Sequence, residues 1–272
     1  MAVIRVLMLG DIVGDAGLEA FETRCGPLKE KWAADLVIIN GENAAGGFGM
    51  TGETLDRILA AGADAVTSGN HVWEKREFWP ALDSGKMVLR PANYGSLEGF
   101  LPGDPLPGRP WLELNAGGVP VFVLNLQGRE MMTPIDCPFR CFDRLYRDIE
   151  RITAGHPLVL VDFHAESTEE KEAFAYYCDG RASLVAGTHT HVQTADERIL
   201  PKGTAYITDL GMSGAQNGII GMDAEICLAR LRSQVAYRMT CAVPQTDGDL
   251  ALHGIAAEFD AETGNALSIT RI

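Results

Sequence analysis

The sequence predicts a mixed α/β domain built of layers, and three observations support this. Apolar β-rich runs alternate with helix-spaced segments over most of the chain, which implies a sheet covered by helices. The final third instead holds successive strand-like runs with short turns, which indicates antiparallel pairing. The 272 residues, 46% of them hydrophobic, are enough for one large core. No composition break marks a second domain, so we predict that residues 1–272 form a single domain.

The first half of the chain is expected to alternate strands and helices. The apolar run Val3–Leu9 predicts a first strand, because it is too short for the hydrophobic region of a signal peptide and has no basic leader. Apolar β-rich runs predict the next strands, and apolar spacing of three and four residues predicts the helices between them. The expected strands are 35–40, 64–68 and 87–90, and the expected helices are 17–34, 52–62 and 75–83.

The second half is expected to begin with a loop and to end in strands. Four prolines and four glycines between residues 94 and 110 predict an ordered surface loop. It and the segment 126–138 are expected near the functional site. The elements expected after the loop are a hairpin at 111–115 and 119–125, a helix at 139–154, strands at 157–163, 182–186, 204–208, 235–243 and 251–259, and a turn at 262–265 into 266–271.

Composition disfavours several classes of protein. A net charge of −14 without a basic run argues against a surface that follows a nucleic-acid backbone. No run approaches the roughly 18 apolar residues of a membrane helix. The six cysteines are scattered without a C-x-x-C pair, which favours reduced thiols over disulfides or structural zinc. We therefore expect a cytoplasmic protein with no membrane partner and no extended nucleic-acid surface, and the sequence leaves a homo-oligomer open.

A glycine-rich turn after the first strand is a weak signal for a dinucleotide cofactor. Gly10, Gly14 and Gly17 are spaced G-x-x-x-G-x-x-G, which differs from G-x-G-x-x-G. Asp11 also stands where a pyrophosphate would approach, which is electrostatically unfavourable. The glycine-rich loop at 46–49 lacks the Lys-Ser/Thr ending of a P-loop. A nucleotide cofactor would also leave the histidines unexplained.

Carboxylates, amides and histidines follow the ends of several predicted strands. Chain reversals at these points would let the separate segments converge on one place. Nitrogen and oxygen donors without thiolates suit a two-metal hydrolytic site. In chain order the residues are Asp11, Glu42, Asn43, Asn70, His71, His164, His189 and His191.

Most of these residues, taken singly, also have an ordinary structural explanation. Asp11 could cap a helix, and His164 is as compatible with a buried structural role as with a ligand. Asp162, two residues before His164, could support that histidine or point into a turn. His189 and His191 give the strongest signal. In an extended segment they would point the same way, about 6.5–7 Å apart, which suits two metals about 3.5–4 Å apart.

The motif order resembles that of the calcineurin-like metallophosphoesterases. Their signature runs D-x-H, G-D, G-N-H, a lone His and G-H-x-H, each after a strand. This chain has Gly69-Asn70-His71, His164 and His189-Thr190-His191 in that order. The likeness runs from Leu9 through the C-terminal strands, essentially the whole chain.

The chain departs from that signature at two points. Val13 stands where D-x-H would place a His, and Gly41-Glu42-Asn43 stands where G-D would supply the bridging Asp. Both departures are similar to the bacterial YmdB-like branch, which uses a Glu as the bridge and an Asn in place of the missing ligand. The resemblance is therefore to that branch, of the 2′,3′-cyclic-nucleotide phosphodiesterase type.

The resemblance implies a fold and two sets of metal ligands. The fold would be a four-layer αββα sandwich, with two mixed β-sheets facing each other inside outer helices. The family implies two iron or manganese ions, and the residues themselves would also allow zinc. Glu42 would bridge the two ions. One metal would be held by Asp11, Glu42, Asn43 and His191, and the other by Glu42, Asn70, His164 and His189.

The resemblance also implies a metal-dependent phosphodiesterase acting on cyclic nucleotides, 2′,3′-cyclic ones included. The metals would polarise the phosphoryl oxygens and activate a bridging hydroxide for in-line attack. His71, similar to the family's proton donor, would protonate the departing alkoxide. Arg129 could bind a phosphate of the substrate, and a surface salt bridge is an equally good explanation of this residue. Asn93 is a weaker candidate for a residue of the substrate cleft.

A regulatory metalloprotein is the alternative function that the sequence leaves open. Such a protein would bind a nucleotide or a protein partner and keep only residual phosphoesterase activity. His71 favours the enzyme, because it is surplus to coordination and needs a chemical role.

Overall fold

Strands and helices alternate along the computed structural model, which describes residues 2–95, 106–153 and 155–272. The strands are β1 (Val3–Leu9), β2 (Asp11–Ile12), β3 (Leu36–Asn40), β4 (Ala65–Thr67), β5 (Trp111–Ala116), β6 (Val119–Gln127), β7 (Leu158–His164), β8 (Leu184–Thr188), β9 (Arg198–Ile199), β10 (Ala205–Ile207), β11 (Met212–Ala215), β12 (Leu250–Leu252), β13 (Gly254–Asp260) and β14 (Ala266–Arg271). The α-helices are α1 (Gly14–Trp32), α2 (Gly52–Ala60), α3 (Trp79–Leu82), α4 (Pro138–Ile152), α5 (Thr168–Cys178) and α6 (Ala224–Ser233), with 3₁₀ helices at Arg76–Phe78 and Asp247–Asp249.

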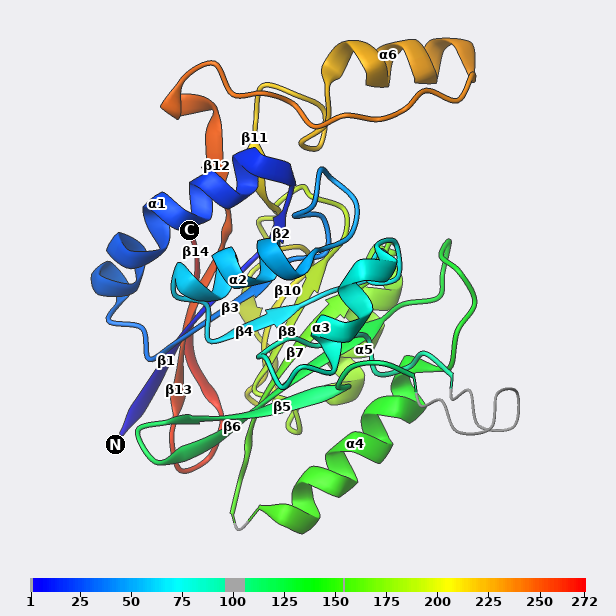
Figure 1. Cartoon of the computed structure of the whole chain (residues 1–272). Coiled ribbons are helices and arrows are strands. Elements are labelled where there is room, and N and C mark those ends of the chain that lie inside the picture. Colours follow the sequence, from blue (N-terminus) through cyan, green and yellow to red (C-terminus); the bar gives the residue numbers. More distant parts are fainter. Residues whose placement is uncertain (1, 96–105, 154) are drawn as a thin grey trace.

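The first sheet joins the two ends of the chain, in the order β14-β13-β1-β3-β4 (Figure 1). β1, β3 and β4 are parallel, as expected of strands connected through helices. β13 runs antiparallel to both β1 and β14, so the predicted antiparallel pairing at the C-terminus is confirmed there. The predicted strand 251–259 is in fact two strands, because β12 pairs with β11 in a separate small sheet.

The second sheet has the order β5-β6-β7-β8-β10-β9. β5 and β6 form the predicted hairpin, and β6, β7, β8 and β10 are parallel. The expectation that 182–186 and 204–208 pair as antiparallel neighbours is therefore wrong. The connection between β8 and β10 is long enough to carry the chain back to the starting edge, and it also contributes the edge strand β9.

Each of the two sheets carries apolar side chains on both of its faces. Along β1, Val6 and Met8 enter one core that also contains residues of the second sheet, whereas Leu7 and Leu9 pack with residues of α1 and α2. In β7, Leu160 enters the shared core while Val161 packs with α4 and α5. Each central strand is therefore buried on both sides, and this explains its unbroken apolar sequence.

Several sequence expectations are corrected by the structure. Residues 87–90 form only isolated bridges, and 75–83 folds as a 3₁₀ turn followed by the short α3. Residues 235–243 form no strand, because the exposed residues 235–238 have no strand beside them and Cys241 makes only an isolated bridge to Met222. Helices α5 and α6 were not expected from the sequence. Of the predicted 94–110 loop, residues 96–105 lie outside the described residues.

Within residues 2–95, 106–153 and 155–272, no helix combines the length and the apolar character needed to cross a bilayer.

Candidate metal centre

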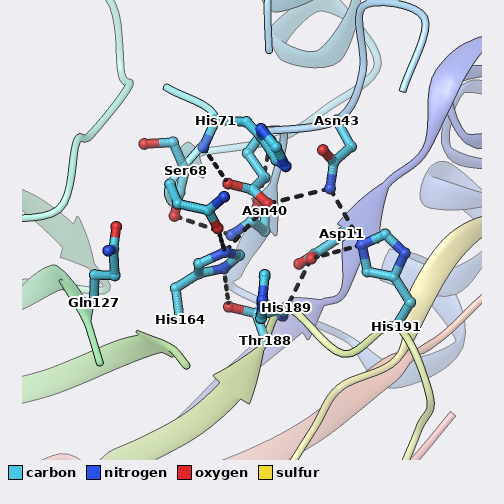
Figure 2. A network of polar contacts seen from close by, with 12 residues as sticks. Asp11, Asn40, Asn43, Ser68, His71, Gln127, His164, Thr188, His189 and His191 are labelled. Carbon is cyan, nitrogen blue, oxygen red and sulfur yellow. Dashed lines mark hydrogen bonds and ion pairs between the residues drawn. The ribbon is translucent and has the colours of Figure 1, made fainter. Parts of the chain in front are cut away.

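All seven predicted metal ligands meet at the carboxyl ends of the two sheets. Figure 2 labels five of them, Asp11, Asn43, His164, His189 and His191. Asp11 lies in β2, directly after β1, and Glu42 follows β3. His164 is the last residue of β7, and His189 directly follows β8. Because carboxyl ends of parallel strands collect at one edge, residues far apart in sequence converge there. Asp11, Glu42 and His164 are fully buried, with 0% of their surface exposed.

One half of the cluster is centred on His164. Its Nε2 lies 2.9 Å from Asn70 Oδ1 and 3.2 Å from Glu42 Oε1. The ligand atoms of Glu42, His164 and His189 all lie within 4.8 Å of one another. These distances bring one carboxylate, one amide oxygen and two imidazoles around a common point.

The other half is centred on His191. Its Nε2 lies 3.3 Å from Asp11 Oδ2 and 3.2 Å from Asn43 Nδ2. The same Asn43 nitrogen donates to Glu42 Oε1 at 3.2 Å. Glu42 therefore contacts members of both halves, which is the place that a shared ligand would occupy.

The charges of these side chains fit a cation. Among the described residues, no Lys or Arg forms an ion pair with Asp11 or Glu42, and Asp11 Oδ1 is buried without a hydrogen-bond partner. His191 Nδ1 donates to the Ile220 carbonyl at 2.9 Å, so its Nε2 is the free nitrogen that faces Asp11. Electron-rich atoms thus face one another inside the protein, and a metal ion with N and O preferences satisfies them.

The pKa values show the same need for positive charge. Burial alone would lower the pKa of His191, but its hydrogen bond to Asp11 raises that pKa to about 9. Burial alone would raise the pKa of Glu42, but the His164 charge lowers it to about 2. Burial, together with the His164 charge, lowers the pKa of His189 to about 3. The carboxylates thus favour positive charge on the histidines that face them, which is the charge that a metal cation would supply.

Asn43 fits a metal only after a simple rearrangement. In the structure its amide nitrogen, not its oxygen, faces Glu42 and His191. A metal ligand must be the oxygen, so the amide would turn over on binding. Oxygen and nitrogen of an Asn amide occupy nearly the same space, and such a turn requires no other movement.

Gly69 leaves the space that the cluster needs. A Cβ at this position would overlap Glu42 Oε2 and His164 Nε2. The glycine of the Gly-Asn-His motif is therefore required by the close approach of its backbone to the ligands, not by its φ angle.

Gly69→Ala is expected to lower both metal content and stability. The added methyl would push Glu42 and His164 apart, and overpacking of this kind costs about 1–3 kcal/mol. Elemental analysis and thermal unfolding would measure the two effects. Gly52→Ala is the matched control, because nothing lies within 4 Å of a Cβ there. Equal metal content in the two variants would show that Gly69 is not packed against a metal site.

The segment from His189 to His191 is not the extended chain that the sequence suggested. β8 ends at Thr188, and His189 and His191 have φ values of 98° and 65°. Such left-handed conformations are strained for residues other than glycine. Asp209 holds the segment by accepting the Thr190 backbone N–H at 3.2 Å and the Thr190 hydroxyl at 2.7 Å. The turn, and not the pleat of a strand, separates the two imidazoles.

Residues that the sequence did not single out support this segment. Buried Lys171 forms an ion pair of 2.7 Å with Asp209. Glu166 Oε2 lies 3.2 Å from His189 Nε2, and the Ile220 carbonyl holds His191. These residues come from α5 and from loops, with no motif spacing that would reveal them.

His71 lies beside the cluster with its ring pointing elsewhere. Its backbone N–H donates to Glu42 Oε2 at 3.1 Å, while ring Nδ1 lies 3.4 Å from Glu74 Oε1. Its side chain is 23% exposed, and the Phe48 ring packs against it edge-on. The imidazole is thus next to the ligands and accessible from outside, as a proton donor to a substrate must be.

The two predicted substrate contacts lie in different environments. Asn93 is fully buried and uses its amide to join backbone groups of Gln127 and Asp136. This places it under the loops and gives it no surface for a substrate. Arg129 donates its backbone N–H to Glu170, and its guanidinium contacts Cys137 Sγ at 3.5 Å. None of these contacts joins either residue to the seven clustered ligands.

Comparisons with known proteins agree on one family. A model of the YmdB-like protein family matches residues 7–272. The 2′,3′-cyclic-nucleotide 2′-phosphodiesterase of Bacillus subtilis is 44% identical over 269 residues, which cover 99% of this chain and 96% of that protein.

Two solved structures are also similar over nearly their whole length. A hypothetical protein from Thermus thermophilus is 39% identical, with a TM-score of 0.85, and the match covers 99% of this chain and 98% of that one. A protein described as a novel phosphatase of Mycoplasma pneumoniae is 31% identical, with a TM-score of 0.88, covering 100% of this chain and 93% of that one.

Proposed function

Because the chain belongs to the YmdB-like protein family, we propose that it is a metal-dependent phosphodiesterase that hydrolyses cyclic nucleotides, 2′,3′-cyclic ones included. The observation that carries this proposal is the position of Glu42 between the His164 half and the His191 half of the cluster. A buried carboxylate shared by two sets of N and O donors is what a two-metal hydrolytic site requires.

Each half of the cluster would hold one metal ion. Bound metals supply Lewis-acid polarisation of a phosphate and activation of water at neutral pH. Iron or manganese, which the family resemblance implies, suits these nitrogen and oxygen donors, and the same donors would also accept zinc. The first ion would be held by Asp11, Glu42, Asn43 and His191, and the second by Glu42, Asn70, His164 and His189.

His71 would act as the proton donor to the leaving alkoxide. Its backbone is fixed by the hydrogen bond to Glu42, so the imidazole is held close to the ligands without being one of them. Glu74, 3.4 Å from Nδ1, orients the ring. Positioned acids of this kind contribute about 10²–10⁴-fold to the rate.

The relative from Bacillus subtilis supports the choice of substrate. It matches nearly the whole chain and is named for 2′,3′-cyclic nucleotides. A small anionic diester also fits a chain of net charge −14, because the bound cations reverse the field locally. Six free cysteines support a cytoplasmic location, where thiols stay reduced.

The whole chain would form one four-layer αββα domain around this site. Support comes from the three apolar clusters, one shared by residues of both sheets and one between each sheet and its helices. The two sheets then meet through their shared core and at the site formed by their carboxyl ends.

Hydrolysis of 2′,3′-cyclic nucleotides tests the proposed function. We expect turnover by protein purified without chelators, its loss on chelation, and its return when manganese or iron is added back. A generic diester such as bis(p-nitrophenyl) phosphate should follow the same pattern. A protein that binds these nucleotides and metals but turns over neither diester would be a regulatory metalloprotein, contrary to the proposal.

A further inference from the structure

A fully buried carboxylate lies behind the metal ligand His164. Asp162 is two residues earlier on β7 and has 0% of its surface exposed. Its oxygens accept hydrogen bonds from the Thr188 hydroxyl at 2.6 Å, from Asn40 Nδ2 at 3.0 Å and from the Thr67 hydroxyl. All three partners donate, which is the pattern of an ionised carboxylate.

The hydroxyl of Thr188 links this carboxylate to His164. Thr188 Oγ1 lies 2.9 Å from His164 Nδ1, and its only hydrogen is donated to Asp162. A hydroxyl that has donated its hydrogen can only accept from the second partner. His164 therefore carries a hydrogen on Nδ1, beside Thr188 in Figure 2, and its Nε2 faces Glu42 and Asn70, where a metal ion would take the Nε2 lone pair.

We propose that Asp162 and Thr188 are positioning residues, which fix the tautomer and the ring orientation of His164 for metal binding. The inference rests on the proposed function, since it concerns the metal that His164 would hold. Carboxylate-supported histidines are stronger ligands, and loss of the supporting partner typically costs about 10–100-fold in metal affinity. Because the Thr188 hydroxyl lies between them, Asp162 can act on the His164 ring although both residues belong to β7.

Thr67 provides a matched control for Thr188. Both hydroxyls donate to Asp162, and both side chains are fully buried. Of the two, Thr188 is the one that also contacts His164. Replacing either by valine removes one hydroxyl from the same carboxylate, and the two variants differ in the bond to the metal ligand.

The experiment measures manganese affinity by chelator competition for the full chain and for its Thr188→Val, Thr67→Val and Thr188→Ser variants. Thr188→Val should bind one of its two ions about 10–100-fold more weakly. Thr67→Val should keep both affinities, and Thr188→Ser, which retains the hydroxyl, should restore them. Thermal unfolding of each variant confirms that it is folded.

Equal metal affinities for Thr188→Val and Thr67→Val would overturn the positioning role. Failure of Thr188→Ser to restore the affinity would also overturn it. A wild-type chain that binds no metal is a different result, because it would contradict the proposed function itself.

An independent feature is the arm formed by residues 223–240, which contains α6 and projects from the body (Figure 1). Its base is fixed by the bond from Asp223 N–H to the Thr240 carbonyl and by Ala242 N–H to the Gly221 carbonyl. Beyond the base, residues 230–238 are all exposed. Cys227 is the one buried residue of α6, so this ten-residue helix has little tertiary packing of its own and would be stabilised by a partner.

The composition of the arm indicates the chemistry of that partner. From residue 226 to the end of the arm at 240 there are three arginines and no acidic residue or lysine, in a chain whose net charge is −14, and the two acidic residues of the arm, Asp223 and Glu225, lie at its base. Leu228, Leu231 and Val235 are more than half exposed, at 51%, 56% and 55%. An apolar, basic arm on an acidic molecule is complementary to that molecule's own surface.

We infer that the arm docks against a second copy of this chain, with its arginines on the acidic surface of that copy. A twofold-symmetric pair would bury two arms, one from each copy. Apolar contact supplies the affinity, and the opposite charges select the partner.

Sedimentation velocity tests this association at micromolar protein. The wild type should be dimeric at low salt, and the double variants Leu228→Glu/Leu231→Glu and Arg230→Glu/Arg232→Glu should be monomeric. Ile152→Glu is the control, because Ile152 is an exposed apolar residue (60%) outside the arm, at the end of α4. A monomeric wild type, or a control as monomeric as the arm variants, would overturn the inference. A wild type that stays monomeric and binds anionic lipid vesicles would also overturn the inference.

Discussion

Replacing Glu42 by Gln is expected to cost more activity than replacing Asn43 by Ala. Glu42 is the carboxylate that contacts both halves of the cluster, so its charge would offset both metal ions. Asn43 offers one neutral oxygen to one ion. The loss for Glu42→Gln should exceed the roughly 10–100-fold that removal of a residue supporting a ligand costs.

Metal content and turnover of 2′,3′-cyclic AMP should be measured together for the two variants. Glu42→Gln should retain less metal at both positions, whereas Asn43→Ala should weaken the His191 position alone. Gln keeps the size of Glu, so a folded variant is expected, and thermal unfolding checks it. Similar metal content and similar turnover in both variants would mean that Glu42 is not shared.

His71→Ala should slow the hydrolysis of a cyclic nucleotide by about 10²–10⁴-fold. The loss arises because the departing alkoxide needs a proton and His71 is the accessible imidazole beside the ligands. Both metal ions should remain, since the Glu42 contact is made by the backbone N–H and survives the substitution. Single-turnover rates with metal analysis of the same sample would measure both.

The leaving group distinguishes an acid from a ligand. A nitrophenolate hardly needs a proton to leave, so bis(p-nitrophenyl) phosphate should suffer much less from His71→Ala. His189→Ala is the matched comparison, because it removes a clustered imidazole and should impair both substrates through loss of metal. Equal damage to both substrates by His71→Ala, with metal lost, would make His71 a ligand.

The sequence predicted the part of the site that depends on strand ends. Apolar runs locate β1, β3, β4 and β7, and a polar residue after a buried strand must lie at the edge of the sheet. Asp11, Glu42 and His164 could therefore be expected to converge before any contact was known. The prediction succeeded because burial and strand direction are local properties of the sequence.

The remaining parts of the site depend on tertiary contacts. The sequence around His189 and His191 gives no local signal for two left-handed backbone conformations. These conformations depend on Asp209, which holds the segment, and on Lys171 of α5, which pairs with Asp209. Residues 235–243 have the composition of a strand, but most of them lie in the arm, where no strand runs beside them, and Cys241 makes only an isolated bridge to Met222. Propensity describes what a segment can form, and the available partners decide what it does form.

Metal stoichiometry is the most direct test of the central claim, that Glu42 is shared between two metal sites. The protein should be purified without chelators and analysed for iron, manganese and zinc, with anomalous scattering from crystals of the same preparation. We expect about two ions per chain, as in other two-metal hydrolytic sites, with Glu42 bound to both. A stoichiometry fixed at one, with Asn70 and His164 far from the ion, would contradict the account.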